Sequence, residues 1–160
     1  MSREDAGRRR VSATPAPAHA RLQVLAIAGL AVDAAVHLHL ASRYDPIGTT
    51  ITQGALFRAE ATAAVVAALL LALRNRRVSW LLAGAVAATG LLAILVTRYL
   101  AVPAIGPVPN MHDPIWYPEK VLAAAAMLLT TASWLTREVL QRKLRWSSDA
   151  VRPAHEMGRP

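Results

Sequence analysis

The first long apolar stretch of the chain carries a carboxylate and an imidazole one helical turn apart. Asp33 and His37 stand at positions i and i+4, which places both side chains on one face of a helix. Asp33 lies about halfway along this stretch, where burying an ionisable side chain in hydrocarbon costs at least ~2.5 kcal/mol. Such a pair suits proton transfer or the binding of a metal ion, so we interpret both residues as candidates for function.

Further polar groups gather near one end of each apolar stretch. The candidate polar cluster comprises Asp33, His37, Tyr44, Arg58, Glu60, Arg98, Glu119 and Lys120. The opposite halves of the stretches carry almost no ionisable group. Because charged side chains are rare in hydrocarbon, this one-sided distribution indicates a polar cluster that faces one side of a membrane.

The cluster has a structural and a functional interpretation. In the structural one, three carboxylates pair with three cations and hold the helices in register. The groups that would pair are Asp33, Glu60 and Glu119 with Arg58, Arg98 and Lys120. In the functional one, the cluster lines a pocket for a metal ion or for a small polar or amphipathic ligand. The predicted metal ligands, suited to zinc or a similar divalent ion, are Asp33, His37, Glu60 and Glu119.

The residue types restrict the cofactors. The chain has no cysteine, which excludes thiolate metal sites, disulfides and cysteine nucleophiles. Haem is disfavoured because the three later apolar stretches contain no histidine to serve as a second axial ligand. Met111 and His112 stand together in a connection and would suit copper, although loop residues of these types are common. A divalent metal or a quinone stays open as the cofactor.

Four stretches are long and apolar enough to cross about 30 Å of hydrocarbon, which takes roughly 20 helical residues. They are residues 22–42, 54–73, 78–100 and 116–136. A chain with 54% hydrophobic and 18% charged residues is neither disordered nor an ordinary soluble domain. We therefore predict an all-α fold, a transmembrane four-helix bundle over residues 21–137.

Small and aromatic residues in these stretches predict how the helices pack. Alanine dominates, and Gly29, Gly84 and Gly90 lie among the alanines. Small side chains let helix backbones approach closely in lipid, both within the bundle and against a membrane-protein partner or a second copy of the chain. The tryptophans that fall near the predicted interfaces, where we interpret them as aromatic anchors, are Trp80, Trp116 and Trp134.

Arginine and lysine residues predict the direction of threading. Most of the 18 arginine and lysine residues lie in segments 1–21, 74–77 and 137–160. Because two spans separate each of these segments from the next, all three lie on the same side of the membrane. The positive-inside rule then puts both termini in the cytoplasm of a cell-membrane protein, with the polar cluster outside. The net charge of +8 follows from these flanking segments, so no nucleic-acid partner is needed to explain it.

The segments outside the spans have their own predictions. Residues 1–20 are polar, basic and proline-bearing and are expected to form a disordered tail. The connection 74–77 leaves room only for a tight helical hairpin. The outer connection, about 101–115, holds four prolines and is expected to be a stiff non-helical cap. Residues 138–160 are expected to form a basic amphipathic helix and tail at the inner surface, next to anionic lipid.

The plan over residues 20–137 resembles small bacterial four-span integral membrane proteins of the DoxX-like size class. The stretches that carry this resemblance are VDAAVHLHLASRYD at 32–45, QGALFRAEA at 53–61 and WYPEK at 116–120. The resemblance implies a role beside membrane redox or quinone chemistry, in a version without thiols because the chain lacks cysteine.

Two functions follow as expectations. The first is an accessory or ligand-binding membrane protein with a polar pocket on the extracytoplasmic side. The alternative is a redox, quinone-linked or metal-binding enzyme component that uses Asp33 and His37 as an acid–base pair. The sequence contains no recognisable nucleophile motif, phosphate-binding loop or zinc signature, which favours the non-enzymatic interpretation.

Overall fold

The computed structural model describes residues 16–48 and 50–151, and this part of the chain is helical without any strand. The four long helices are α1 (Ala16–Ala41), α2 (Gln53–Leu73), α3 (Arg77–Tyr99) and α4 (Pro118–Val151). A short 3₁₀ helix, η2 (Ser42–Tyr44), follows α1. The predicted all-α class is confirmed.

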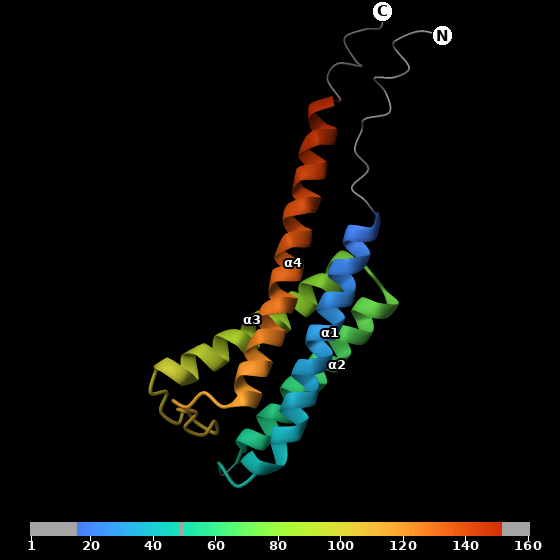
Figure 1. Ribbon diagram of the computed structural model, residues 1–160. Helices are drawn as coiled ribbons and strands as arrows, with labels where there is room; N and C mark the ends of the chain where they lie inside the picture. Colours follow the sequence, from blue (N-terminus) through green and yellow to red (C-terminus); the bar gives the residue numbers. More distant parts are fainter. Residues whose placement is uncertain (1–15, 49, 152–160) are drawn as a thin grey trace, which may run out of the picture.

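The helices form an irregular bundle in which α1 lies between α2 and α4 (Figure 1). α3 packs mainly on α4 and is inclined to the other three helices in this view. The start of α1, the end of α4 and the 74–76 connection lie toward one end, which we call the hairpin end. The connections 42–52 and 100–117 lie at the other end, which we call the long-loop end.

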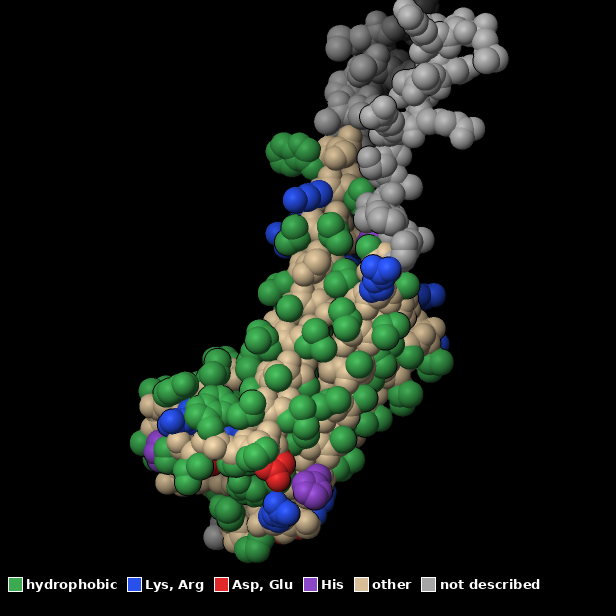
Figure 2. Space-filling model, viewed as in Figure 1, with side chains coloured by type: hydrophobic (Ala, Val, Ile, Leu, Met, Phe, Trp, Pro, Cys, Tyr) green, Lys and Arg blue, Asp and Glu red, His purple; other side chains and the backbone are tan. Residues whose placement is uncertain are grey.

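Three helices in the described part of the chain, α1, α2 and α3, are long and apolar enough to cross a membrane. Large apolar side chains are exposed along the helices and spread over the middle of the molecule (Figure 2). α4 falls short by composition, because its uncharged stretch covers only 121–136, between Lys120 and Arg137. The chain therefore has the character of a membrane protein, while the fourth span stays a prediction.

The ends of the helices differ from the prediction at two places. α1 begins at Ala16, so the last residues of the predicted disordered tail are helical; residues 1–15 lie outside the described part. α4 begins at Pro118 rather than at 116, and it continues without a break to Val151. At 1.5 Å per residue its 34 residues extend about 50 Å, and its end projects beyond the start of α1 (Figure 1). The expected separate helix after residue 137 is thus the second half of α4, and residues 152–160 lie outside the described part.

Small residues bring the helix backbones together. The main core consists largely of alanines from α1, α2 and α3, among them Ala26, Ala64 and Ala83, which are completely buried. A Cβ on Gly84 would overlap the indole ring of Trp134, so glycine is needed where α4 crosses α3. In an apolar solvent, such close approach gains dispersion contacts that a larger side chain would prevent.

Polar side chains close the hairpin end. Gln23 Nε2 donates to the Leu71 carbonyl at 2.9 Å, Asn75 Nδ2 donates to Gln23 Oε1 at 2.9 Å, and Trp80 Nε1 donates to Asn75 Oδ1 at 2.6 Å. Trp80 is only 1% exposed, and the Arg137 guanidinium lies 5.1 Å from its ring centroid. The interpretation of Trp80 as an interfacial anchor was therefore wrong, because this ring fills the core of the hairpin end.

The connection 100–117 covers the long-loop end without forming a helix. Hydrogen bonds tie it to the helices, among them Asp113 N to the Thr97 carbonyl at 3.0 Å and Gln53 Nε2 to the Asn110 carbonyl at 2.7 Å. Within the connection, His112 Nδ1 lies 3.1 Å from the Leu100 carbonyl. A chain that runs back over the helix ends in this way can serve as a roof.

Candidate functional site

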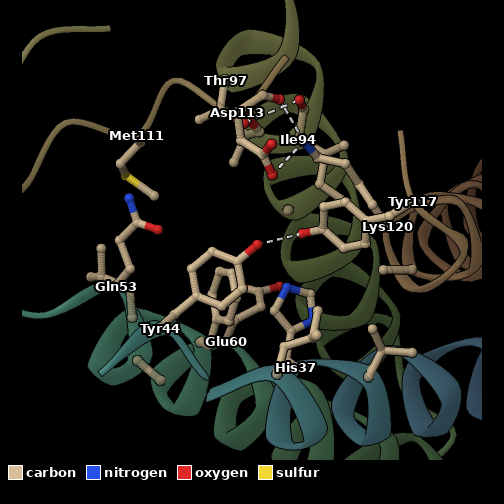
Figure 3. A pocket seen from close by; sticks show the side chains of 18 of the residues that line it. His37, Tyr44, Gln53, Glu60, Ile94, Thr97, Met111, Asp113, Tyr117 and Lys120 are labelled. Atoms are coloured by element: carbon tan, nitrogen blue, oxygen red, sulfur yellow. Dashed lines mark hydrogen bonds and ion pairs between the residues drawn. The ribbon is translucent and has the colours of Figure 1, made fainter. Parts of the chain in front are cut away.

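A cavity of about 550 Å³ lies at the long-loop end, between the four helices and under the connection 100–117 (Figure 3). Most of its lining side chains are apolar. The polar side chains that reach it are His37, Tyr44, Gln53, Glu60, Thr97, Asp113, Tyr117 and Lys120. The inclined α3 leaves this space, because its second half diverges from α1 and α2 (Figure 1).

His37 and Asp33 form the deepest polar contact beside the cavity. His37 Nδ1 lies 3.0 Å from the Asp33 carbonyl oxygen, to which it is hydrogen-bonded, and 2.8 Å from Asp33 Oδ1. Asp33 is 1% exposed, and neither of its carboxylate oxygens has a hydrogen bond of good geometry among the described residues. The predicted i, i+4 pair is therefore formed, with His37 on the cavity wall and Asp33 behind it.

Glu60 of α2 brings a second carboxylate to the same place. It lines the cavity and lies close enough to Asp33 and His37 to interact with both electrostatically. Its Oε1 is buried and has no hydrogen-bond partner among the described residues. Gly90 makes room for it, since a Cβ there would lie 2.8 Å from Glu60 Oε1 and 2.6 Å from Met127 Cε.

Aromatic side chains form the wall above these groups. Phe57 meets His37 edge-on with ring centroids 5.2 Å apart and packs on Tyr44 at 4.8 Å. The hydroxyls of Tyr44 and Tyr117 are hydrogen-bonded at 3.0 Å across the cavity (Figure 3). Either hydroxyl can be the donor of this bond.

Lys120 reaches the connection that roofs the cavity rather than the cavity floor, which His37 and Glu60 form. Its ammonium lies 2.9 Å from Asp113 Oδ2 and donates to the carbonyls of Asp113 and Ile115 at 2.7 and 3.3 Å. The side chain is 6% exposed and lies 5.5 Å from the Tyr117 ring centroid. Its charge is thus matched by Asp113, a residue outside the predicted cluster.

Three members of the predicted cluster lie away from the cavity. Arg58 donates to both carboxylate oxygens of Asp45 at 2.6 and 2.7 Å, on the exposed side of α2. This pairing lowers the pKa of the Asp45 carboxyl. Glu119 lies 3.8 Å from Arg43 at the surface, while the Arg98 guanidinium lies 5.1 Å from the Tyr99 ring centroid.

These contacts overturn the structural interpretation in the form in which it was predicted. Among the described residues, no ion pair joins Asp33, Glu60 or Glu119 to Arg58, Arg98 or Lys120. Each cation that forms a pair has a carboxylate near it in the chain or at the surface instead. The two carboxylates beside the cavity are left with one imidazole between them.

The predicted metal ligands are not assembled into one site. In the part of the chain that the structure describes, no group of three or more His, Asp or Glu side chains is placed to hold a metal ion. Asp33, His37 and Glu60 are neighbours, but Glu119 points to Arg43. The two residues of the predicted copper site also have different surroundings, because Met111 lines the cavity whereas His112 contacts the Leu100 carbonyl.

The predicted cluster did not include Gln53, Phe57 or Tyr117, all of which line the cavity. Periodicity held a signal for two of them: Gln53 and Phe57 precede Glu60 by seven and three residues, and these spacings keep a side chain on one helical face. The same rule turns Arg58 away from Glu60. Tyr117 and Asp113 come from a non-helical connection, where no period applies.

Searches against protein-family models, curated proteins and solved structures find no match to this chain. The resemblance to four-span proteins of the DoxX-like size class therefore stays a prediction. The chemistry of the site has to be argued from its own residues.

Proposed function

We propose that this protein is a four-span protein of the cell membrane that binds a small amphipathic molecule in the cavity at its long-loop end. One observation carries the proposal: the cavity of about 550 Å³ has apolar walls and a buried polar floor. Binding pockets for small molecules have this size and this mixture of many apolar and few polar groups. In this proposal the protein is a binding or accessory protein rather than an enzyme.

The charges at the ends of α4 support a fourth span despite the short uncharged stretch. Lys120 is matched by Asp113, and Arg137 Nη1 lies 3.0 Å from Glu138 Oε1 while its guanidinium packs over Trp80. Paired charges at the ends of a helix cost less in the interfacial region than isolated ones. The uncharged residues 121–136 span about 24 Å, close to the hydrocarbon thickness once the paired flanks are included.

The arginines support an orientation with the cavity outside. Arg74, Arg76 and Arg77 lie at the hairpin end, the same end as the start of α1 and the basic second half of α4. The positive-inside rule places this end in the cytoplasm. The cavity then opens toward the outer leaflet, from which an amphipathic molecule can enter.

The cavity itself supports the class of ligand. Its apolar wall, with Val36, Leu40 and Ile94, suits a hydrocarbon or ring body. His37, Glu60 and the hydroxyls of Tyr44 and Tyr117 offer hydrogen bonds to a polar head. A molecule with both parts gains from each only when it lies with its head toward the floor.

A photolabelling experiment tests the proposal. The full-length protein in lipid nanodiscs is irradiated with decanol that carries a diazirine, and labelled peptides are mapped by mass spectrometry. We expect labels at lining residues of α2, α3 and α4 that excess decanol displaces. Ala93→Trp, which places a ring in the cavity, should remove them, whereas Ala85→Trp on an exposed position of the same helix should not. Equal labelling in both variants contradicts the proposal.

A quinone is the second candidate ligand, and one observation favours it. The Tyr44–Tyr117 hydroxyl pair lies in an apolar wall near His37, and a quinone carbonyl accepts hydrogen bonds from such groups. Organic extraction of the purified protein followed by mass spectrometry tests this candidate. A quinone that is retained by Ala85→Trp and lost in Ala93→Trp supports it, and extracts without a quinone exclude it.

A further inference from the structure

We propose that the ligand is a lipophilic amine whose protonated nitrogen binds between Glu60 and the Asp33–His37 pair. This inference rests on the proposed function and specifies the ligand class of the same cavity. It begins with the balance of charge around the floor. Glu60 and Asp33 are two carboxylates, and His37 is the one basic group between them.

Among the described residues of this end, no lysine or arginine lies at the floor of the cavity. Among the described residues that line the cavity, Lys120 is the only lysine or arginine, and its ammonium is held by Asp113 and two carbonyls. Arg58 is turned to Asp45 on the outside of α2. The floor is therefore left with a surplus of negative groups even when His37 carries a proton.

The unsatisfied hydrogen-bond acceptors at the floor also favour a cationic ligand. Oε1 of Glu60 is buried without a hydrogen-bond partner among the described residues, and the Asp33 carboxylate behind His37 has only that imidazole, 2.8 Å from its Oδ1, as a counter-charge. A buried acceptor without a donor is costly, and a buried carboxylate without a counter-charge costs more. An ammonium supplies both what the acceptors need and the charge that balances them. A carboxylate or phosphate head would add a third negative group to the same space.

The wall above the floor also favours a cation with an apolar body. Phe57 meets His37 in an edge-to-face contact and packs on Tyr44, so aromatic rings line the wall near the floor, and aromatic faces attract an ammonium group by cation–π interaction. Further up, the wall is aliphatic, with Leu40 and Ile94. A bare inorganic cation would leave this apolar surface uncovered, whereas a lipophilic amine covers it.

Three photoprobes of equal length test the charge of the head group. Diazirine-bearing decylammonium, decanol and decanoate are compared on the full-length protein in phosphatidylcholine nanodiscs. Labelling of cavity peptides is normalised to labelling of the lipid, which corrects for partition into the bilayer. We expect decylammonium to reach half-maximal labelling at a concentration at least tenfold below that of decanol, and decanoate to label less than decanol.

Glu60→Gln and Glu119→Gln form a matched pair of variants. Both remove one negative charge at the same end, but Glu119 lies outside the cavity near Arg43. We expect Glu60→Gln to lose most of the preference for decylammonium over decanol. Its circular dichroism spectrum and melting temperature show whether the variant is folded. Glu119→Gln should keep the preference.

The outcomes separate this inference from the proposed function. Equal labelling by the three heads, or an equal loss in both glutamine variants, overturns the amine inference while the cavity still binds amphiphiles. Absence of displaceable labelling by all three probes overturns both. If Glu60→Gln does not fold, Gly90→Ala provides the second variant, because its Cβ displaces the Glu60 carboxylate; an unchanged preference in Gly90→Ala then contradicts the inference.

Discussion

The two ends of the molecule use their buried polar groups in opposite ways. At the hairpin end, Gln23, Asn75 and Trp80 form a continuous set of hydrogen bonds that ends on the Leu71 carbonyl. At the long-loop end, Asp33 and Glu60 keep carboxylate oxygens without partners beside a cavity. Trp134 Nε1 is also buried without a partner among the described residues, but its ring is packed against Gly84 in the core, whereas the unpartnered carboxylate oxygens of the long-loop end lie beside a cavity where a ligand can satisfy them. Four predictions test this contrast.

The largest expected effect is the removal of the ring that fills the hairpin end. Trp80→Ala deletes a side chain that is 1% exposed and breaks its hydrogen bond to Asn75, so we expect a loss of about 3 kcal/mol or more in the free energy of unfolding. Thermal unfolding of the purified protein, followed by circular dichroism, measures it. Trp146→Ala, at an 80% exposed position, serves as the control. Similar melting temperatures for the two variants would contradict the assignment of Trp80 to the core.

Two glycines on α3 allow a direct comparison of the ends. Gly84→Ala forces a Cβ against the indole of Trp134, so we expect a stability loss of about 1–3 kcal/mol and unchanged ligand labelling. Gly90→Ala meets the movable ends of Glu60 and Met127, so we expect a smaller stability loss but weaker binding of decylammonium. The two measurements are the melting temperature and the photolabelling midpoint. If both variants change both quantities in parallel, the ends are not functionally separate.

The roof over the cavity depends in part on one exposed hydrogen bond. Gln53→Ala removes the 2.7 Å bond from Gln53 Nε2 to the Asn110 carbonyl, at a cost of about 1 kcal/mol or less. We expect faster hydrogen exchange at residues 110–113, with no change at the hairpin end. Thr62→Val, which removes an exposed hydroxyl that donates to the Arg58 carbonyl, is the control. Equal hydrogen-exchange rates at residues 110–113 in the wild type and in Gln53→Ala would show that this bond does not hold the connection in place.

The smallest effect concerns the exposed Asp45–Arg58 pair and its dependence on pH. Arg58 lowers the pKa of the Asp45 carboxyl in the folded protein, so the pair stabilises the fold above the unfolded-state pKa of about 3.9. This stabilisation is lost as the pH falls through the lower folded-state pKa. We expect Asp45→Asn to melt slightly below wild type at pH 6 and together with it near pH 2. A difference that does not shrink on acidification would point to the backbone contacts of Asp45.

The length of the apolar stretches predicted the helices, and the helical period predicted part of the site. The spacing of Asp33 and His37 placed them together correctly, because i, i+4 neighbours depend only on the geometry of one helix. It also held the information that Gln53 and Phe57 share the face of Glu60. The pairing of charges between helices was predicted wrongly. That pairing depends on the rotation and inclination of each helix and on the path of the connection that brings Asp113 to Lys120.

The sequence by itself determined the all-α class, the approximate extent of four helices and the apolar character of three of them, since these properties depend on local composition and period. The tertiary structure alone decided that α3 is inclined, that a cavity forms at the long-loop end, and that Arg58 and Glu119 turn away from it. The physical reason is that helix orientation in an alanine-rich bundle follows from close contacts such as Gly84 with Trp134. Those contacts join residues far apart in the chain, so no local pattern encodes them.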